Sequence, residues 1–217
     1  MKSALEDVWE HREEVIYPQL FGPKARGIFV LDFNLFTHTF KQADVDPRWL
    51  HYGVLEHGPT DRGTYHYVTS GGSNPWENEP ENYAKQEFSG FGTELVLETP
   101  ESADWPIVVL QRLLAFNILL VYGRYGGSKP LDYWHRVPLG GPITRNSALH
   151  HLLIVPPNSY TSQFSLASGK VDLLHVVGIT EKERDYAKAN GSEALLRLLK
   201  ERGAFPVTDP DRTCIAP

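Results

Sequence analysis

Aromatic side chains and carboxylates gather in one short stretch of the chain, a combination suited to binding another protein. Trp76 and Tyr83 stand in an acidic, loop-like run that ends near Glu87 and contains a single lysine. Tryptophan and tyrosine are favoured interface anchors because they bury much surface at little entropic cost. Carboxylates around them would form a charged rim that selects a basic partner and speeds the encounter. The candidate partner-binding residues are Tyr67, Trp76, Glu77, Glu79, Glu81 and Tyr83.

The opposite interpretation of this stretch stays open. Both rings could fold back onto the core, and a run of glutamates is most often a solvated face that binds nothing. The residue types and their spacing are compatible with either interpretation.

A second group of residues could support hydrolysis of a small molecule. A hydrolase elbow needs a glycine two residues before its serine, and the segment around Ser70 lacks it. A phosphate-binding loop needs glycine, lysine and serine in a fixed order, and residues 123–130 have these in the wrong order. We therefore predict no catalytic residue and no cofactor. The histidines and acids that keep a hydrolase open as an alternative are His66, Glu94, His135 and His175.

Residues able to bind a metal ion are poorly arranged. His150 and His151 are neighbours on a predicted strand, so their side chains point to opposite sides. The single cysteine, Cys214, can form neither an intramolecular disulfide nor a cysteine zinc cage. We predict no metal site.

Charge and hydropathy argue against two classes of partner. The 217 residues include 21 Lys and Arg against 27 Asp and Glu, a net charge of −6, with no basic cluster. Because nucleic-acid binding depends on basic groups that neutralise phosphates, we predict no nucleic-acid partner. No apolar run approaches the roughly 20 residues of a membrane span. Residues 1–7 turn acidic where a signal peptide would be apolar. These features predict a cytoplasmic protein with no membrane partner.

Capping signals and periodicity predict the helices. Ser3 with Glu6, and Thr180 with Glu183, have the spacing of capping boxes. The first helix carries an apolar stripe, and Pro18 together with Gly22-Pro23 should stop it. Helices are expected over residues 3–17, from 105 to about 121, over 180–189 and over 192–202.

Runs of β-branched and aromatic residues predict the strands. They are interspersed with the helices without a regular βαβ rhythm, which favours an α+β fold with a mixed, mainly antiparallel sheet flanked by helices. No repeat or linker divides residues 1–217, so we expect one domain to which residues 1–48 contribute a helix and a strand. Strands are expected over residues 27–39, 49–56, 64–69, 91–99, 149–155, 163–166 and 170–177, with a short closing strand over 205–208.

Short blocks of sequence occur in an order and spacing that are specific together although each is weak alone. They lie at residues 66–73, 89–95, 105–114, 135–139, 169–171, 175–183 and 195–196, with the last near Asp209. From residue 49 to residue 209 the chain thereby resembles the suppressor of fused domain family. One departure is Gly72, which stands where the usual family pattern Gly-Leu-Ser has leucine. This glycine predicts a looser loop within the same fold.

The resemblance implies binding rather than catalysis. Animal members hold a zinc-finger transcription factor of Hedgehog signalling, partly by clamping an extended peptide, and they carry a second, C-terminal domain that this sequence does not show. The chain looks like the bacterial single-domain branch, whose members resemble immunity proteins that neutralise secreted toxins. The resemblance brings no established catalytic residues.

Three functions are therefore weighed. The favoured one is a non-enzymatic protein-binding module, interpreted as a cytoplasmic immunity protein that covers a basic toxin domain by steric occlusion. The alternatives are a small-molecule hydrolase with a histidine and acid site, and a structural or chaperone-like subunit.

Overall fold

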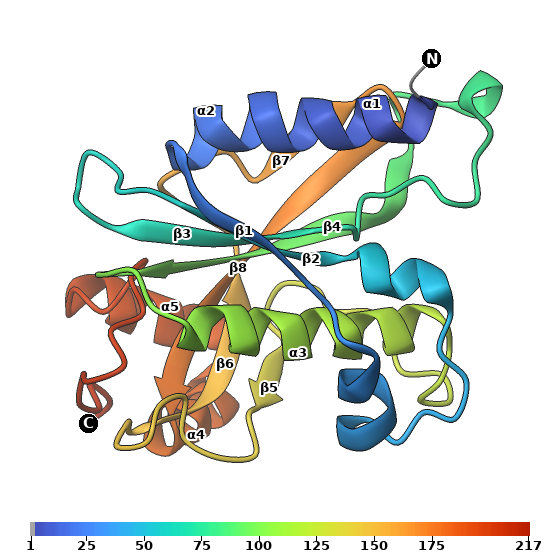
Figure 1. Ribbon diagram of the computed structural model, residues 1–217. Helices are drawn as coiled ribbons and strands as arrows, with labels where there is room; N and C mark the ends of the chain where they lie inside the picture. Colours follow the sequence, from blue (N-terminus) through green and yellow to red (C-terminus); the bar gives the residue numbers. More distant parts are fainter. Residues whose placement is uncertain (1–2) are drawn as a thin grey trace.

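The computed structural model describes residues 3–217, which form one eight-stranded sheet with helices packed against both faces (Figure 1). The strand order is β1-β2-β3-β4-β8-β6-β5, and β7 pairs with β8 beside this path. Among the named strands of residues 3–217, β4 and β8 form the one parallel pair, which confirms a mixed, mainly antiparallel sheet in an α+β fold. The strands are β1 (Lys24–Val30), β2 (Gly53–His57), β3 (Tyr65–Ser70), β4 (Phe88–Thr99), β5 (Arg136–Pro138), β6 (Leu149–Val155), β7 (Gln163–Leu166) and β8 (Gly169–Thr180).

Alternation along the strands divides the core between the two faces. Successive strand residues point to opposite sides, so Val54 and Tyr67 pack with α3 (Trp105–Val121), whereas Leu55 and Val68 pack with the N-terminal helix. Farther along the sheet, β6 and β8 bury a third cluster against α4 (Glu181–Asn190) and α5 (Ser192–Glu201). Because both faces are covered, successive residues of the central strands are buried on both sides.

The N-terminal helix is longer than the sequence predicts. It runs through α1 (Ala4–Glu10), the π-helix η1 (His11–Ile16) and α2 (Tyr17–Phe21), and it passes Pro18. The wider turn of η1 lies just before this proline, at the point where a residue without N–H would otherwise disturb the ladder. The helix ends at Gly22, which has a φ of +89°. The capping box of Ser3 and Glu6 is confirmed.

Two predicted strands are too long because aspartates start helical turns within or just before them. The strand expected over residues 27–39 ends at Val30, since the Asp32 side chain accepts a hydrogen bond from the backbone N–H of Asn34 and starts the π-helix η2 (Leu35–Thr39). The strand expected over 49–56 begins only at Gly53, since Asp46 caps the 3₁₀-helix η3 (Pro47–His51). The predicted strands over 149–155 and 163–166 are confirmed as β6 and β7.

Four further strand segments differ from the prediction. β4 and β8 extend beyond their predicted bounds, and β5 lacked any strand signal because it has three residues and ends in proline. The short closing strand expected over 205–208 is reduced to one bridge between Glu98 and Val207. The acidic run contains a 3₁₀ turn, η4 (Pro80–Asn82).

Replacing Thr180 with alanine should lower the free energy of unfolding by about 1–2 kcal/mol. The buried Thr180 hydroxyl accepts from the N–H of Glu183, and the Glu183 carboxylate accepts from the N–H of Thr180, so α4 loses a cap that water cannot replace. Urea denaturation would measure the loss. Ser3→Ala removes the same cap at an exposed position and should cost less. Equal losses would contradict the role of burial.

Candidate protein-binding surface

A tight loop, residues 71–75, joins β3 to the segment of residues 76–87, which we call the acidic segment. The loop leaves no room for side chains at its glycines. At Gly71, where φ is +137°, a Cβ atom would lie 2.4 Å from the Tyr52 ring, and at Gly72 it would lie 2.4 Å from the Thr93 carbonyl oxygen. Gly72 therefore allows the loop to pack closely against Thr93. The looser loop predicted from this glycine is not found.

The buried carboxylate of Glu94, on β4, holds this loop in place. One of its oxygens accepts hydrogen bonds from the backbone N–H groups of Gly71 and Ser73 at 3.1 and 2.9 Å, and from the Ser73 hydroxyl at 2.6 Å. The other oxygen accepts from the Thr69 hydroxyl. With both oxygens engaged and no exposed surface, Glu94 serves as a structural anchor of the loop.

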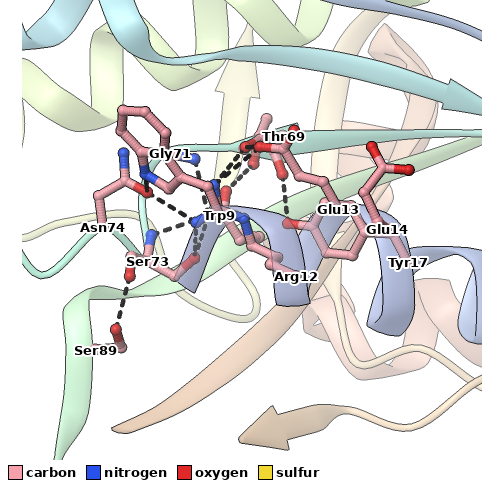
Figure 2. A network of polar contacts seen from close by, with 12 residues as sticks. Trp9, Arg12, Glu13, Glu14, Tyr17, Thr69, Gly71, Ser73, Asn74 and Ser89 are labelled. Carbon is pink, nitrogen blue, oxygen red and sulfur yellow. Dashed lines mark hydrogen bonds and ion pairs between the residues drawn. The ribbon is translucent and has the colours of Figure 1, made fainter. Parts of the chain in front are cut away.

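A buried arginine from the N-terminal helix closes the same network (Figure 2). Arg12 is 1% exposed, and its guanidinium donates to Ser73 Oγ and Asn74 Oδ1, both at 2.8 Å, and to Ser70 Oγ at 2.6 Å. It lies 3.8 Å from a Glu94 oxygen. Burial alone would lower the pKa of Arg12, but Tyr17 and the nearby carboxylates keep it raised, so the cation persists.

Trp76 lies where the acidic segment leaves this anchored loop. Its ring is half-buried between Trp9, at 5.9 Å between ring centroids, and His51, at 6.0 Å. Its Nε1 is buried and has no hydrogen-bond partner among residues 3–217. A hollow of about 270 Å³ opens beside it, reaching Phe91 and Tyr122. The ring is thus fixed in direction and only partly covered.

Tyr83 marks the other end of the acidic segment. It is half-buried and packs against the cluster under the N-terminal helix. Burial, together with Glu79, raises the pKa of its hydroxyl. A second hollow, of about 360 Å³, lies between Tyr83 and the first turns of the helix, where it is lined by Asp7, Val8 and His11. Figure 1 shows the segment beside the N-terminal end of α1.

The glutamates between these two rings point to solvent. Glu77 is 73% exposed and pairs with Arg48 at 2.7 Å, while Glu79 and Glu81 are exposed at the start of η4. The acidic segment therefore carries negative charge between two half-buried rings, each beside a hollow.

Tyr67 does not lie at this surface. It is fully buried between the sheet and α3, where its hydroxyl donates to the Ala103 carbonyl at 2.9 Å and accepts from the Ala103 N–H at 2.7 Å. Side chains alternate between the two faces along β3, and the Tyr67 side chain lies on the face that packs against α3. The structure thus separates it from the other five candidate residues.

The four residues considered for hydrolysis are spread over three places. Glu94 belongs to the loop network, and His135 lines a hollow beside β5. His66 and His175 are both buried in contact with the Tyr160 ring. In residues 3–217, no three His, Cys, Asp or Glu side chains converge in a way that could hold a metal ion.

Residues on other elements, which the sequence did not single out, support this surface. Trp9 donates from Nε1 to Asn74 at 2.8 Å, His51 stacks on Trp9, and Arg48 holds Glu77. Arg12 carried the clearest signal, because an arginine within the apolar stripe of the first helix must find buried partners.

The comparison with protein families decides the relationship. The family described as Suppressor of fused protein (SUFU) matches residues 48–213. The chain belongs to the suppressor of fused family. The match confirms the resemblance seen over residues 49–209, and none of the curated proteins compared with the chain matches it.

Solved structures of the suppressor of fused family share the fold. Drosophila Suppressor of Fused aligns at a TM-score of 0.58 with 19% identity, over 76% of this chain and 42% of that one, so this chain spans less than half of its length. A chain of the Sufu–Fu complex aligns at 0.64 with 19% identity, over 97% and 91%. A SUFU homologue from Neisseria gonorrhoeae aligns at 0.56 with 18% identity, over 84% and 93%.

A membrane span needs a long helix that is apolar throughout. In the described part of the chain, no helix combines the length and the apolar character that crossing a bilayer requires.

Proposed function

We propose that this suppressor of fused protein is a non-enzymatic protein-binding module that covers a basic partner with its acidic segment. The observation that carries the proposal is the arrangement of Trp76 and Tyr83, each beside a hollow, with Glu77, Glu79 and Glu81 exposed between them. A partner's side chains would enter the hollows against the rings, and its cations would meet the carboxylates. Tyr67 is fully buried, so it would support this surface from below without contacting the partner.

The partner class follows from the charge. A net charge of −6 and an acidic segment suit a protein whose own active site is basic, such as a domain that cleaves nucleic acids. We propose the role of a cytoplasmic immunity protein of a bacterial single-domain type, which blocks such a toxin domain by steric occlusion. The Sufu–Fu complex gives a precedent for protein binding within the family.

Capture from the native host at low and at physiological salt tests the proposal. The wild-type chain should retain a basic protein that a Glu77→Lys/Glu79→Lys/Glu81→Lys variant retains poorly. That protein, expressed alone, should arrest growth, and co-expression of the wild-type chain should relieve the arrest. A captured set that is the same for both chains, or a captured protein without toxicity, would count against the immunity role.

The triple reversal should slow association with the captured protein about 10- to 100-fold at low salt. Each reversal adds two positive charges, so the net charge rises from −6 to 0 and electrostatic steering is lost. Stopped-flow mixing at several salt concentrations would measure this rate. A matched control, Glu193→Lys/Glu201→Lys/Asp211→Lys, reverses three exposed acids elsewhere and gives the same net charge. Equal slowing by the control would place the effect in net charge rather than in the acidic segment.

A structural or chaperone-like subunit remains the second candidate, because two half-buried rings could also bind a copy of the same chain. Size-exclusion chromatography with light scattering separates the two. A stable homo-oligomer that the triple reversal dissociates would favour the subunit role.

A further inference from the structure

A second surface of the molecule lies between α3 and β5, and we call it the α3–β5 groove. Two adjoining hollows, of about 530 and 360 Å³, share four lining residues: Phe116, Tyr125, Val137 and Pro138. Helix α3 and strand β5 both contribute residues to its lining. None of the residues that line these hollows belongs to the acidic segment or lines its two hollows.

The groove exists because apolar surface is left uncovered at the end of the sheet. Helix α3 is apolar on nearly all sides, a composition typical of a fully buried helix. The sheet covers one side of it, but β5 is the last strand in the order and has only three residues. Facing the gap is a row of rings, with Phe40 and Phe116 at 6.4 Å and Phe116 and Tyr125 at 5.5 Å.

The rim of the groove is positively charged. Arg112, Lys129 and Arg136 are exposed among the lining residues, and in the described part of the chain no aspartate or glutamate lines either hollow. Within residues 3–217, none of these three cations lies within ion-pair distance of a carboxylate; Arg136 donates instead to the Ser192 hydroxyl at 2.7 Å. The chain as a whole has a net charge of −6, whereas the rim of this groove is positively charged.

We propose that the α3–β5 groove binds a negatively charged peptide segment of a partner protein. The segment's apolar side chains pack along Phe40, Phe116 and Tyr125, and its carboxylates reach the cations on the rim. Apolar grooves of this kind bind amphipathic segments, and charge on the rim selects their sign. The acidic segment of a second copy fits less well, because its own fold already holds Trp76 and Tyr83 half-buried. The inference is independent of the proposed function, since it concerns other residues and a partner of opposite charge.

Selection from a library of random displayed peptides of about a dozen residues tests the proposal. The bait is the full chain carrying the Glu77→Gln/Glu79→Gln/Glu81→Gln changes, so that residues 76–87 attract few basic peptides and gain no cation that would attract acidic ones. Enriched peptides should carry net negative charge and at least two large apolar residues. Fluorescence anisotropy with a synthetic copy of the most enriched peptide should show binding that Arg112→Glu/Lys129→Glu weakens about tenfold or more, about 1.4 kcal/mol or more. Lys182→Glu, an exposed lysine on α4, should leave it unchanged.

Phe116→Ala provides a second variant that keeps the rim charges. It should weaken the same peptide while circular dichroism shows a folded chain. Peptides without negative charge, no enrichment, or equal binding to the wild-type rim and the reversed rim would overturn the proposal. So would a concentration-dependent dimer that both charge-reversal variants dissociate, because the occupant would then be a second copy.

Discussion

Replacing Arg12 with methionine should lower the free energy of unfolding by about 3 kcal/mol. The methionine fills similar space but leaves the hydroxyls of Ser70 and Ser73 and the oxygen of Asn74 without their shared donor, in a region with almost no exposed surface. Glu94 loses its nearest cation at the same time. Breaking a buried charged network by removing one partner is costly because the remaining groups stay desolvated.

Chemical denaturation measures this loss, and hydrogen exchange locates it. The amides of Gly71 and Ser73 should exchange faster in the variant, because the loop retains Glu94 but loses its attachment to the N-terminal helix. Arg197→Met is the matched control, since Arg197 is exposed on α5. A loss no larger than that of the control would contradict a stabilising network.

The Glu94→Gln variant tests whether the stabilising effect of Arg12 depends on Glu94 or on the other partners of Arg12. If Arg12 and Glu94 act as one unit, the double variant should lose less stability than the sum of the two single variants, by more than about 0.5 kcal/mol. Additive losses would instead assign the effect of Arg12 to its serine and asparagine partners.

The sequence could predict that Arg12 is special but not why. Val8, Arg12 and Ile16 follow one another at helical spacing on the apolar stripe, which places a cation against the sheet. Its acceptors, Ser70 to Asn74 and Glu94, come from a loop and a strand far along the chain. A local sequence pattern cannot reveal contacts between residues so far apart in the chain, so the network can be recognised only in the folded structure.

The helices with capping boxes and the strongly apolar strands could be predicted because their signals are local. The errors came where one polar side chain overrides a β-rich composition. Asp32 and Asp46 each accept a backbone N–H two residues on, which turns the chain where its apolar residues favour a strand. Such hydrogen bonds depend on the side-chain conformation and leave little trace in hydrophobic periodicity.

The residue types of the candidate surface could be predicted, but the burial of each side chain could not. Period-two alternation places Tyr67 and Val68 on opposite faces of β3, but since helices cover both faces, alternation could not show that either side reaches solvent. Trp76 and Tyr83 follow a loop instead, where no periodicity applies. Their half-buried positions depend on Trp9 and on the first turns of the N-terminal helix.

Acidification from pH 7.5 to pH 4 should remove about 3 kcal/mol of stability through His175 alone. The ring is fully buried in the neutral form, with Nε2 at 2.9 Å from the Pro206 carbonyl and Nδ1 at 2.8 Å from the Tyr160 hydroxyl. Burial lowers its pKa to about 4, against about 6.5 in the unfolded chain. Between these values the unfolded state binds more protons, so stability falls as the pH falls. The ionisable groups whose charge acts on this ring are Glu98, His66 and Arg62.

Denaturation curves at several pH values, for the wild type and for His175→Gln, test this window. The variant should be less stable at pH 7.5 but should lose less stability between pH 6.5 and pH 4. A residual slope should remain, because burial also lowers the pKa of His57. Glu98, whose pKa is lowered to about 2 by His66 and Thr64 despite its burial, contributes only below about pH 4.5. His38→Gln changes an exposed histidine and should keep the wild-type slope. If His175→Gln also keeps that slope, the acid sensitivity lies elsewhere and the ring is not held neutral by its burial.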